Sequence, residues 1–255
     1  MLTTRPRLVR QDRITDLERT QVADRFGVVL ALLVATVFFS VAATDRPWAS
    51  LVTGLALSAT AVIAMWASGA ARRVVRAGIT IAVLGIGVAS FATITGGSLG
   101  TRTIAATSLV LTLLTMGAIA RRIRVHAEIS LMTVLAALCV YVLLGLAFSF
   151  TYELLDHLGS EPFFVGHASA IRSDFVYFSY VTLATVGYGD LTAAGGLGRA
   201  FAVTEGLMGQ IYLVTAVAAL VGNLGRRRRG RPLDGSSGQD ETPEEPAGRE
   251  GSPGT

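Results

Sequence analysis

The chain has 255 residues, of which 51% are hydrophobic and only 16% are charged, and its mean hydropathy is +0.55. This composition is too apolar for an ordinary soluble domain and indicates a membrane protein. The formal net charge is +4, carried by 22 basic residues against 18 acidic ones. Cys139 is the single cysteine, which excludes an intrachain disulfide and favours a small buried residue at that position.

Six runs, uncharged except for Glu205 in the last, are long enough to cross a bilayer as helices, which takes about 20 residues. These runs are 26–44, 47–71, 77–101, 103–120, 129–152 and 200–225. The run 175–189 is too short to cross. It predicts a re-entrant segment, because polar backbone is tolerated at membrane depth where it lines a water-filled path. The predicted fold is therefore an all-α membrane protein with six transmembrane helices, four followed by two.

Every basic residue other than histidine is an arginine, and the arginines alternate between rich and poor segments. The rich segments are the N-terminus before residue 26, the loops at 72–76 and 121–124, and the tail from 226. This pattern places both termini in the cytoplasm. The run from Arg226 to Arg231 directly follows an apolar span, so we interpret it as a stop-transfer anchor or anionic-lipid contact rather than a nucleic-acid site.

The chain divides into four parts: a cytoplasmic segment 1–26, four spans in 27–124, a second unit 125–225, and a tail 226–255 that is poor in apolar residues and expected to be disordered. Such a short polar tail cannot build a soluble ligand-binding domain.

The three histidines are scattered without metal-ligand spacing, and no nucleophile has a candidate base. The sequence predicts neither an enzyme nor a cofactor.

The most informative motif is Thr-Val-Gly-Tyr-Gly-Asp at 185–190, with Thr182 three places upstream. A loop whose consecutive carbonyls all face one axis must alternate between ordinary and positive φ, and glycine permits the positive value. Gly187 and Gly189 occupy every second place. Such carbonyls replace the water shell of a potassium ion, while Thr185 adds a hydroxyl oxygen. One chain supplies one wall of a closed ring, so the motif predicts a homo-oligomer.

The stretch around this motif resembles the potassium channel family. The resemblance implies an outer helix at 127–150, a turret at 151–172, a pore helix at about 173–184, a filter at 185–190 and an inner helix at about 198–224. It also implies a fourfold assembly, with K⁺ held at Thr185, Val186, Gly187 and Tyr188 and Gly189 completing the filter. In the inner helix, which Gly198 and Arg199 open as in the family, Gly209 falls on the gating-hinge position. Gly209 and Gly206 alternatively serve only to let neighbouring helices approach closely.

Two positions depart from the family pattern. Many bacterial channels carry a glutamate behind the filter, where this chain has Val181. Asp190 and Tyr177 keep the family's aspartate and its aromatic partner, so they are candidate filter supports together with Thr182. Glu205 is an ionisable residue inside a span, and such residues are costly unless they have a role. We expect Glu205 to face protein and to hydrogen-bond near the back of the filter or to Gln210 of an adjacent subunit; a protonated, purely structural glutamate is the alternative.

Four plus two spans is the layout of voltage-gated channels, but the fourth span, 103–120, contains no charge. Such a span supplies almost no gating energy, since each charge moved yields about 2.3 kcal/mol per 100 mV. The first four helices are therefore expected to be a scaffold.

At the outer mouth, Arg172 and four acids in 151–174 give a formal charge of 1 − 4 = −3, which predicts a cation-attracting ring unless they form an ordinary solvated turret. The acids are Glu153, Asp156, Glu161 and Asp174.

These observations predict a homotetrameric potassium channel of the plasma membrane, with K⁺ as permeant ion and weak voltage dependence. A less selective cation channel and a membrane scaffold or sensor with a structural pore loop are the alternatives.

Overall fold

The computed structural model describes residues 26–42, 47–95, 99–125 and 131–229, and in these ranges the chain forms seven helices, with no strand beyond one isolated bridge between Phe164 and Ala193. The helices are Phe26–Ala42, α2 (Pro47–Ala67), α3 (Arg72–Thr95), α4 (Leu99–Val125), α5 (Leu131–Leu158), α6 (Arg172–Leu183) and α7 (Gly196–Arg229). The predicted segment 1–26, apart from Phe26, and the tail from 230 lie outside the described residues.

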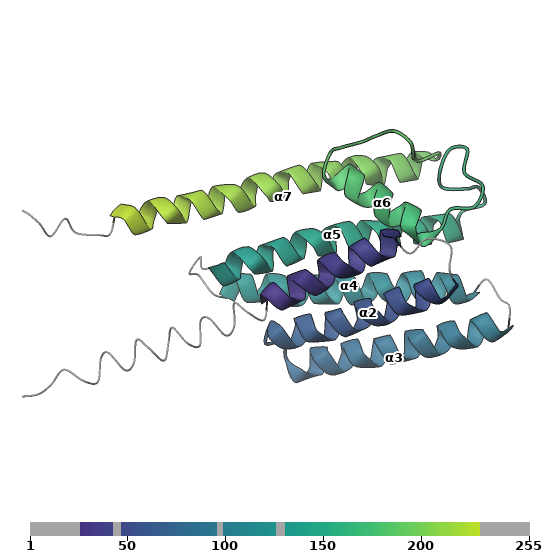
Figure 1. The fold of residues 1–255 in the computed structure, drawn as a ribbon, viewed down its shortest axis with the longest axis horizontal. Coiled ribbons are helices and arrows are strands. Elements are labelled where there is room, and N and C mark those ends of the chain that lie inside the picture. Colours follow the sequence, from purple (N-terminus) through teal and green to yellow (C-terminus); the bar gives the residue numbers. More distant parts are fainter. Residues whose placement is uncertain (1–25, 43–46, 96–98, 126–130, 230–255) are drawn as a thin grey trace, which may run out of the picture.

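Helix α5 occupies the centre of the arrangement, because it packs against α4 on one side and against α6 and α7 on the other. Figure 1 shows α2, α3 and α4 as a bundle below α5, with the short α6 held between α5 and one end of the long α7. The site described below lies at that end.

Three described helices are long and apolar enough to cross a membrane: Arg102–Arg124, Met132–Leu158 and Gly196–Ala219. Phe26–Ala42 and Val52–Ala67 are apolar but shorter. The helical, membrane-type fold agrees with the prediction from composition, whereas the full count of six spans remains a prediction.

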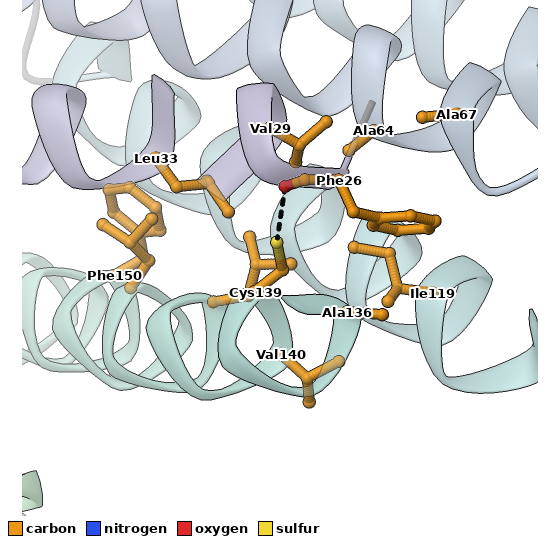
Figure 2. Packing of buried hydrophobic residues seen from close by; sticks show 12 residues of the cluster. Phe26, Val29, Leu33, Ala64, Ala67, Ile119, Ala136, Cys139, Val140 and Phe150 are labelled. Atoms are coloured by element: carbon orange, nitrogen blue, oxygen red, sulfur yellow. Dashed lines mark hydrogen bonds between the residues drawn. The ribbon is translucent and has the colours of Figure 1, made fainter. Parts of the chain in front are cut away.

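The helix Phe26–Ala42 is attached to α5 by a cluster of buried side chains (Figure 2). Phe26, Val29 and Leu33 are at most 2% exposed and pack with Ala136 and Cys139 of α5. Lipid tails are as apolar as these side chains, so close packing rather than exclusion of water holds them together. Cys139 is fully buried, as expected, and its thiol donates a weak hydrogen bond to the Phe26 carbonyl at 3.8 Å.

Hydroxyl groups inside these apolar helices bond to the carbonyl one turn before them. Thr36, Thr60, Thr112 and Thr115 each donate to residue i−4 at 2.7 Å. A polar group in an apolar surrounding is costly without a partner, and this local bond supplies one. These hydroxyl groups of the first helices are therefore satisfied within their own helices.

Three predicted boundaries are corrected by the structure. Helix α5 continues eight residues beyond the expected end at 150, through the first part of the predicted turret, and ends before Gly159. Helix α7 begins at Gly196 and runs through Arg229, so residues 226–229 are helical and the expectation of disorder from 226 was wrong for them. An uncharged run marks only the part of a helix that can lie in an apolar surrounding. Charged residues such as glutamate and arginine are good helix formers and continue the helix into more polar surroundings.

Candidate functional site

The short helix α6 leads directly into the 185–190 motif and is fixed at both ends. At its start the Ile171 N–H donates to Asp174 Oδ2 at 2.9 Å, and the Asp174 N–H donates to the Ile171 carbonyl at 3.0 Å. This pairing satisfies amide groups that a helix N-terminus leaves without intrahelical partners. At its end the Ala184 N–H donates to the Tyr180 carbonyl. The chain therefore enters the motif from a defined direction.

Positive φ alternates along the motif: Thr185 has a φ of 57°, Gly187 of 53° and Gly189 of 81°. Thr185 is the only non-glycine residue with positive φ in the described part of the chain. The alternation predicted for the two glycines therefore extends one step earlier, to a β-branched residue that adopts this geometry at a cost. The residue types of the motif did not predict this strained backbone conformation at Thr185.

Backbone hydrogen bonds tie the inner end of the motif to α6. The amides of Val186 and Gly187 both donate to the Val181 carbonyl, at 2.9 and 3.3 Å, and the Thr185 amide donates to the Thr182 carbonyl at 2.9 Å. Val181 lacks the carboxylate that many relatives of the resembled family carry, but its backbone still holds the loop. The Thr185 hydroxyl accepts a hydrogen bond from Gln210 Nε2 on α7 at 3.3 Å. Gln210 thus contacts the motif within its own chain.

At the outer end, the Tyr177 hydroxyl of α6 donates to Asp190 Oδ2 at 2.8 Å. This hydrogen bond stabilises the ionised form and holds the pKa of Asp190 below its ordinary value of 3.8. In the isolated chain Val186 is 51% exposed and Tyr188 is 71% exposed. The loop is therefore anchored at both ends by α6 and presents its middle to the outside of the single chain.

Glu205 of α7 is fully buried, as expected of an intramembrane carboxylate that faces protein. The Tyr152 hydroxyl of α5 lies 2.6 Å from its Oε2, and the Ser179 hydroxyl of α6 makes a short contact to its Oε1. The same Ser179 oxygen lies 2.6 Å from the Gly145 carbonyl oxygen. Within the described residues, the hydrogen-bond partners of Glu205 are therefore on α5 and α6, while a contact with Gln210 of an adjacent subunit stays a prediction. Glu205 joins three helices behind the motif.

The two glycines proposed as hinges differ in their surroundings. A Cβ at Gly209 would lie 2.7 Å from the Leu183 carbonyl oxygen and 2.8 Å from its Cδ1, whereas at Gly206 the nearest atom would be the Thr182 carbonyl oxygen at 3.9 Å. Contacts under 3 Å require something to move. Helix α7 continues unbroken through both positions. Gly209 is therefore required for the close approach of α7 to the end of α6.

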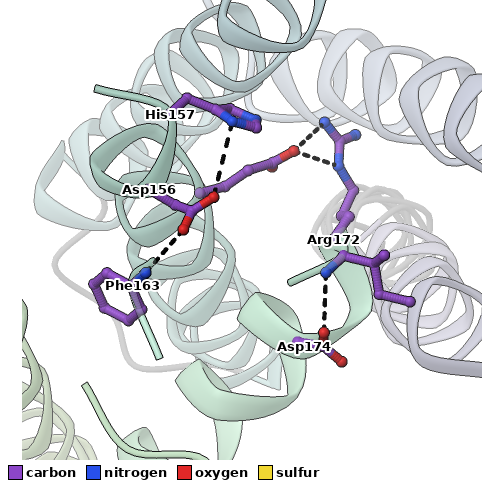
Figure 3. Close-up of polar contacts among 7 residues, drawn as sticks. Asp156, His157, Phe163, Arg172 and Asp174 are labelled. Carbon is purple, nitrogen blue, oxygen red and sulfur yellow. Dashed lines mark hydrogen bonds and ion pairs between the residues drawn. The ribbon is translucent and has the colours of Figure 1, made fainter. Parts of the chain in front are cut away.

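Three of the four acids at the expected outer mouth make local contacts (Figure 3). Glu153 is 6% exposed and pairs with Arg172, which donates to its Oε1 from two nitrogens at 3.0 and 3.2 Å. Asp156 accepts a hydrogen bond from the Phe163 amide at 2.9 Å, and Asp174 caps α6. Of the four acids, Glu161 alone is exposed. The formal charge of −3 is unchanged by these contacts, and a cation-attracting ring stays a prediction.

Sequence reasoning missed Tyr152 and Ser179, because each acts through a partner on another helix and carries no motif of its own. It named Gln210 as a partner of Glu205 and missed its contact with Thr185. In the described residues, no group of three His, Cys, Asp or Glu side chains comes together as a metal site.

Comparison with known proteins supports an ion channel. Residues 129–226 match the family model described as "Ion channel". The protein named LctB of Geobacillus stearothermophilus is 35% identical over 88 residues, which are 32% of this chain and 65% of that protein. This chain therefore spans less than two thirds of that relative's length. No solved structure matches. The matched region holds α5, α6, the motif and most of α7, and together with the apolar helices it indicates a membrane-embedded ion channel.

Proposed function

We propose that this protein is a potassium-selective channel whose filter is formed by residues 185–189 from four copies of the chain. The observation that carries the proposal is the alternation of positive φ at Thr185, Gly187 and Gly189 immediately after α6. This alternation turns successive carbonyls toward one side of the loop, which is the arrangement that replaces the hydration shell of K⁺. Potassium occupies positions along Thr185, Val186, Gly187 and Tyr188.

A single chain offers one wall, so the remaining carbonyls come from identical neighbours. An apolar stripe on α7 supports such an assembly, because Val203, Leu207, Ile211 and Val214 are each at least 60% exposed in the single chain and recur at helical spacing. Subunit contacts and lipid cover this stripe.

The homotetramer lies in the plasma membrane with six spans per chain and cytoplasmic termini, and the first four helices form a scaffold around the pore. It is a passive conductor.

Potassium efflux from liposomes containing the purified protein tests the proposal. Gly187→Ala adds a Cβ at positive φ, which costs about 1–2 kcal/mol in each chain and is repeated in every subunit. No atom outside its immediate neighbours lies within 4 Å of that Cβ in the single chain, so the effect is conformational rather than a clash. Gly195→Ala is the matched control, because Gly195 has equal space and no positive φ. We expect efflux to be lost in the first variant and retained in the second; equal efflux in both would refute the filter.

A further inference from the structure

Three close oxygen–oxygen contacts form a chain behind the filter, from the Gly145 carbonyl through the Ser179 hydroxyl and the Glu205 carboxyl to the Tyr152 hydroxyl. The outer two contacts are both 2.6 Å, and the contact between Ser179 and Glu205 is short. Ser179, Glu205 and Tyr152 are each fully buried. Two oxygens at this separation are hydrogen-bonded, so each contact requires one proton.

The hydroxyl groups supply too few protons for these contacts. Ser179 and Tyr152 each carry one hydroxyl proton, and the Gly145 carbonyl carries none. Tyr152 uses its proton toward Glu205 Oε2. The single proton of Ser179 serves either the Gly145 carbonyl or Glu205 Oε1, but not both. Three contacts and two hydroxyl protons leave one proton to be supplied, and the carboxyl group is the remaining carrier.

We propose that Glu205 is a neutral carboxylic acid that donates its proton to Ser179, and that in this form it is a positioning residue for the filter. Ser179 then donates to the Gly145 carbonyl, and Tyr152 donates to the free carboxyl oxygen. Each of the three oxygen–oxygen contacts then holds one proton, as buried hydrogen-bonded groups require. The inference rests on the proposed channel function only where it speaks of conduction.

The chain of hydrogen bonds holds α6 between α5 and α7. Ser179 lies on α6 two residues before Val181, whose carbonyl accepts the amides of Val186 and Gly187. Removing the proton from Glu205 turns the Ser179 hydroxyl toward the carboxylate and leaves its oxygen facing the Gly145 carbonyl with no proton between them. The two oxygens then repel, α6 moves away from α5, and the loop anchored on Val181 shifts with it.

The titratable groups that face Glu205 are tyrosines. Tyr152 and Tyr141 approach it from α5 and Tyr180 from α6, and Tyr212 is the other titratable side chain of α7 between 200 and 225. Both of its hydrogen-bond partners in the described residues are hydroxyl groups. No cation in these contacts compensates an ionised carboxylate. All the groups around Glu205 therefore oppose its loss of a proton at alkaline pH.

Infrared difference spectroscopy of the purified protein at neutral pH tests the protonation state without any reference to conduction. We expect a carboxylic-acid C=O band that shifts on hydrogen–deuterium exchange, is absent in Glu205→Gln and is present in Glu161→Gln, which removes an exposed carboxyl. The inference would be overturned if the wild-type spectrum differed from the Glu205→Gln spectrum only in carboxylate bands. This result is independent of whether the protein conducts potassium.

Single-channel recording tests the positioning role. The side-chain amide introduced by Glu205→Gln can donate to Ser179 and accept from Tyr152, so the open lifetime of this variant should stay within about twofold of wild type. We expect alkaline pH to shorten the open lifetime of wild type and to leave that of Glu205→Gln unchanged. Glu205→Val removes both contacts and should shorten open lifetime about tenfold, the factor expected for losing a buried hydrogen bond. Wild-type lifetimes in Glu205→Val, or alkaline shortening that persists in Glu205→Gln, would contradict it.

Discussion

Glu153 and Arg172 form a buried ion pair, with 3.0 Å between the guanidinium Nη2 and the carboxylate Oε1, which fastens the C-terminal end of α5 to the first residue of α6. The guanidinium also lies over the Phe150 ring at 5.7 Å from its centroid. This pair fixes the outer end of α6, whereas the chain of hydrogen bonds through Glu205 fixes its middle. The orientation of the helix before the filter therefore depends on two separate polar contacts with α5.

Breaking this pair should destabilise the protein rather than change ion attraction. Glu153→Gln leaves Arg172 as an uncompensated, mostly buried charge, which costs about 3 kcal/mol. Glu161→Gln removes an equal charge from an exposed position and should be close to neutral. Thermal unfolding in detergent measures both. Similar melting temperatures for the two variants would show that the ion pair contributes little.

The outer acids also give a salt-dependence test. Because Arg172 pairs with Glu153, and Asp156 and Asp174 accept backbone hydrogen bonds, Glu161 is the one exposed carboxylate of the four and the simplest to remove without breaking a contact. Glu161→Gln should reduce potassium conductance modestly at low salt and leave it unchanged at high salt, where charges are screened within about 3 Å at 1 M. Comparing conductance of wild type and Glu161→Gln at two ionic strengths makes the measurement. An equal fractional loss at both would assign another role to this residue.

Gly209 and Gly206 offer a matched pair for separating packing from hinge motion. Gly209→Ala places a Cβ 2.7 Å from the Leu183 carbonyl and should destabilise the contact of α7 with α6 by about 1–3 kcal/mol, whereas Gly206→Ala meets nothing closer than 3.9 Å. Oligomer stability by gel filtration and thermal unfolding should fall only in the first variant. An altered open probability in Gly209→Ala with undiminished stability would instead support a hinge.

The Tyr177–Asp190 hydrogen bond predicts a dependence on acid pH. A pKa lowered in the folded protein contributes stability that is present above the ordinary value and lost as pH falls through the lowered pKa. Asp190 should therefore remain ionised at pH 3.8, its ordinary pKa. Tyr177→Phe removes the main cause of the shift, so the acid loss of conductance should begin at higher pH than in wild type. Conductance recorded between about pH 3 and 6 checks this, and coincident profiles would refute it.

Voltage should act only weakly on opening. Helix α4 carries Arg102 near one end and Arg121, Arg122 and Arg124 at the other, with no charge between them. Moving one charge across the field yields about 2.3 kcal/mol per 100 mV, so a span without internal charge has little to contribute. Recordings over a wide voltage range should give a shallow open-probability curve without gating currents. Steep activation with gating currents would contradict the scaffold assignment.

The sequence predicted the parts of this molecule that depend on local chemistry. The uncharged runs located helices, and the alternating glycines located the loop with positive φ. It did not predict contacts between distant segments: the partners of Glu205 on α5 and α6, the pairing of Glu153 with Arg172, and the approach of Gly209 to Leu183. These depend on how helices cross, which residue spacing within one helix does not encode. The positive φ at Thr185 was also missed, because tertiary constraints rather than residue type impose it.

Reversal potential under bi-ionic conditions tests the central assignment most directly. With potassium on one side of a bilayer containing the purified protein and sodium on the other, a filter built from the carbonyls of residues 185–189 discriminates between the ions by how well those oxygens replace each hydration shell. We predict a reversal potential displaced strongly toward the potassium equilibrium potential, and loss of the current in Gly187→Ala but not in Gly195→Ala. A reversal potential near zero, with a current that Gly187→Ala leaves unchanged, would contradict a potassium-selective filter at this motif.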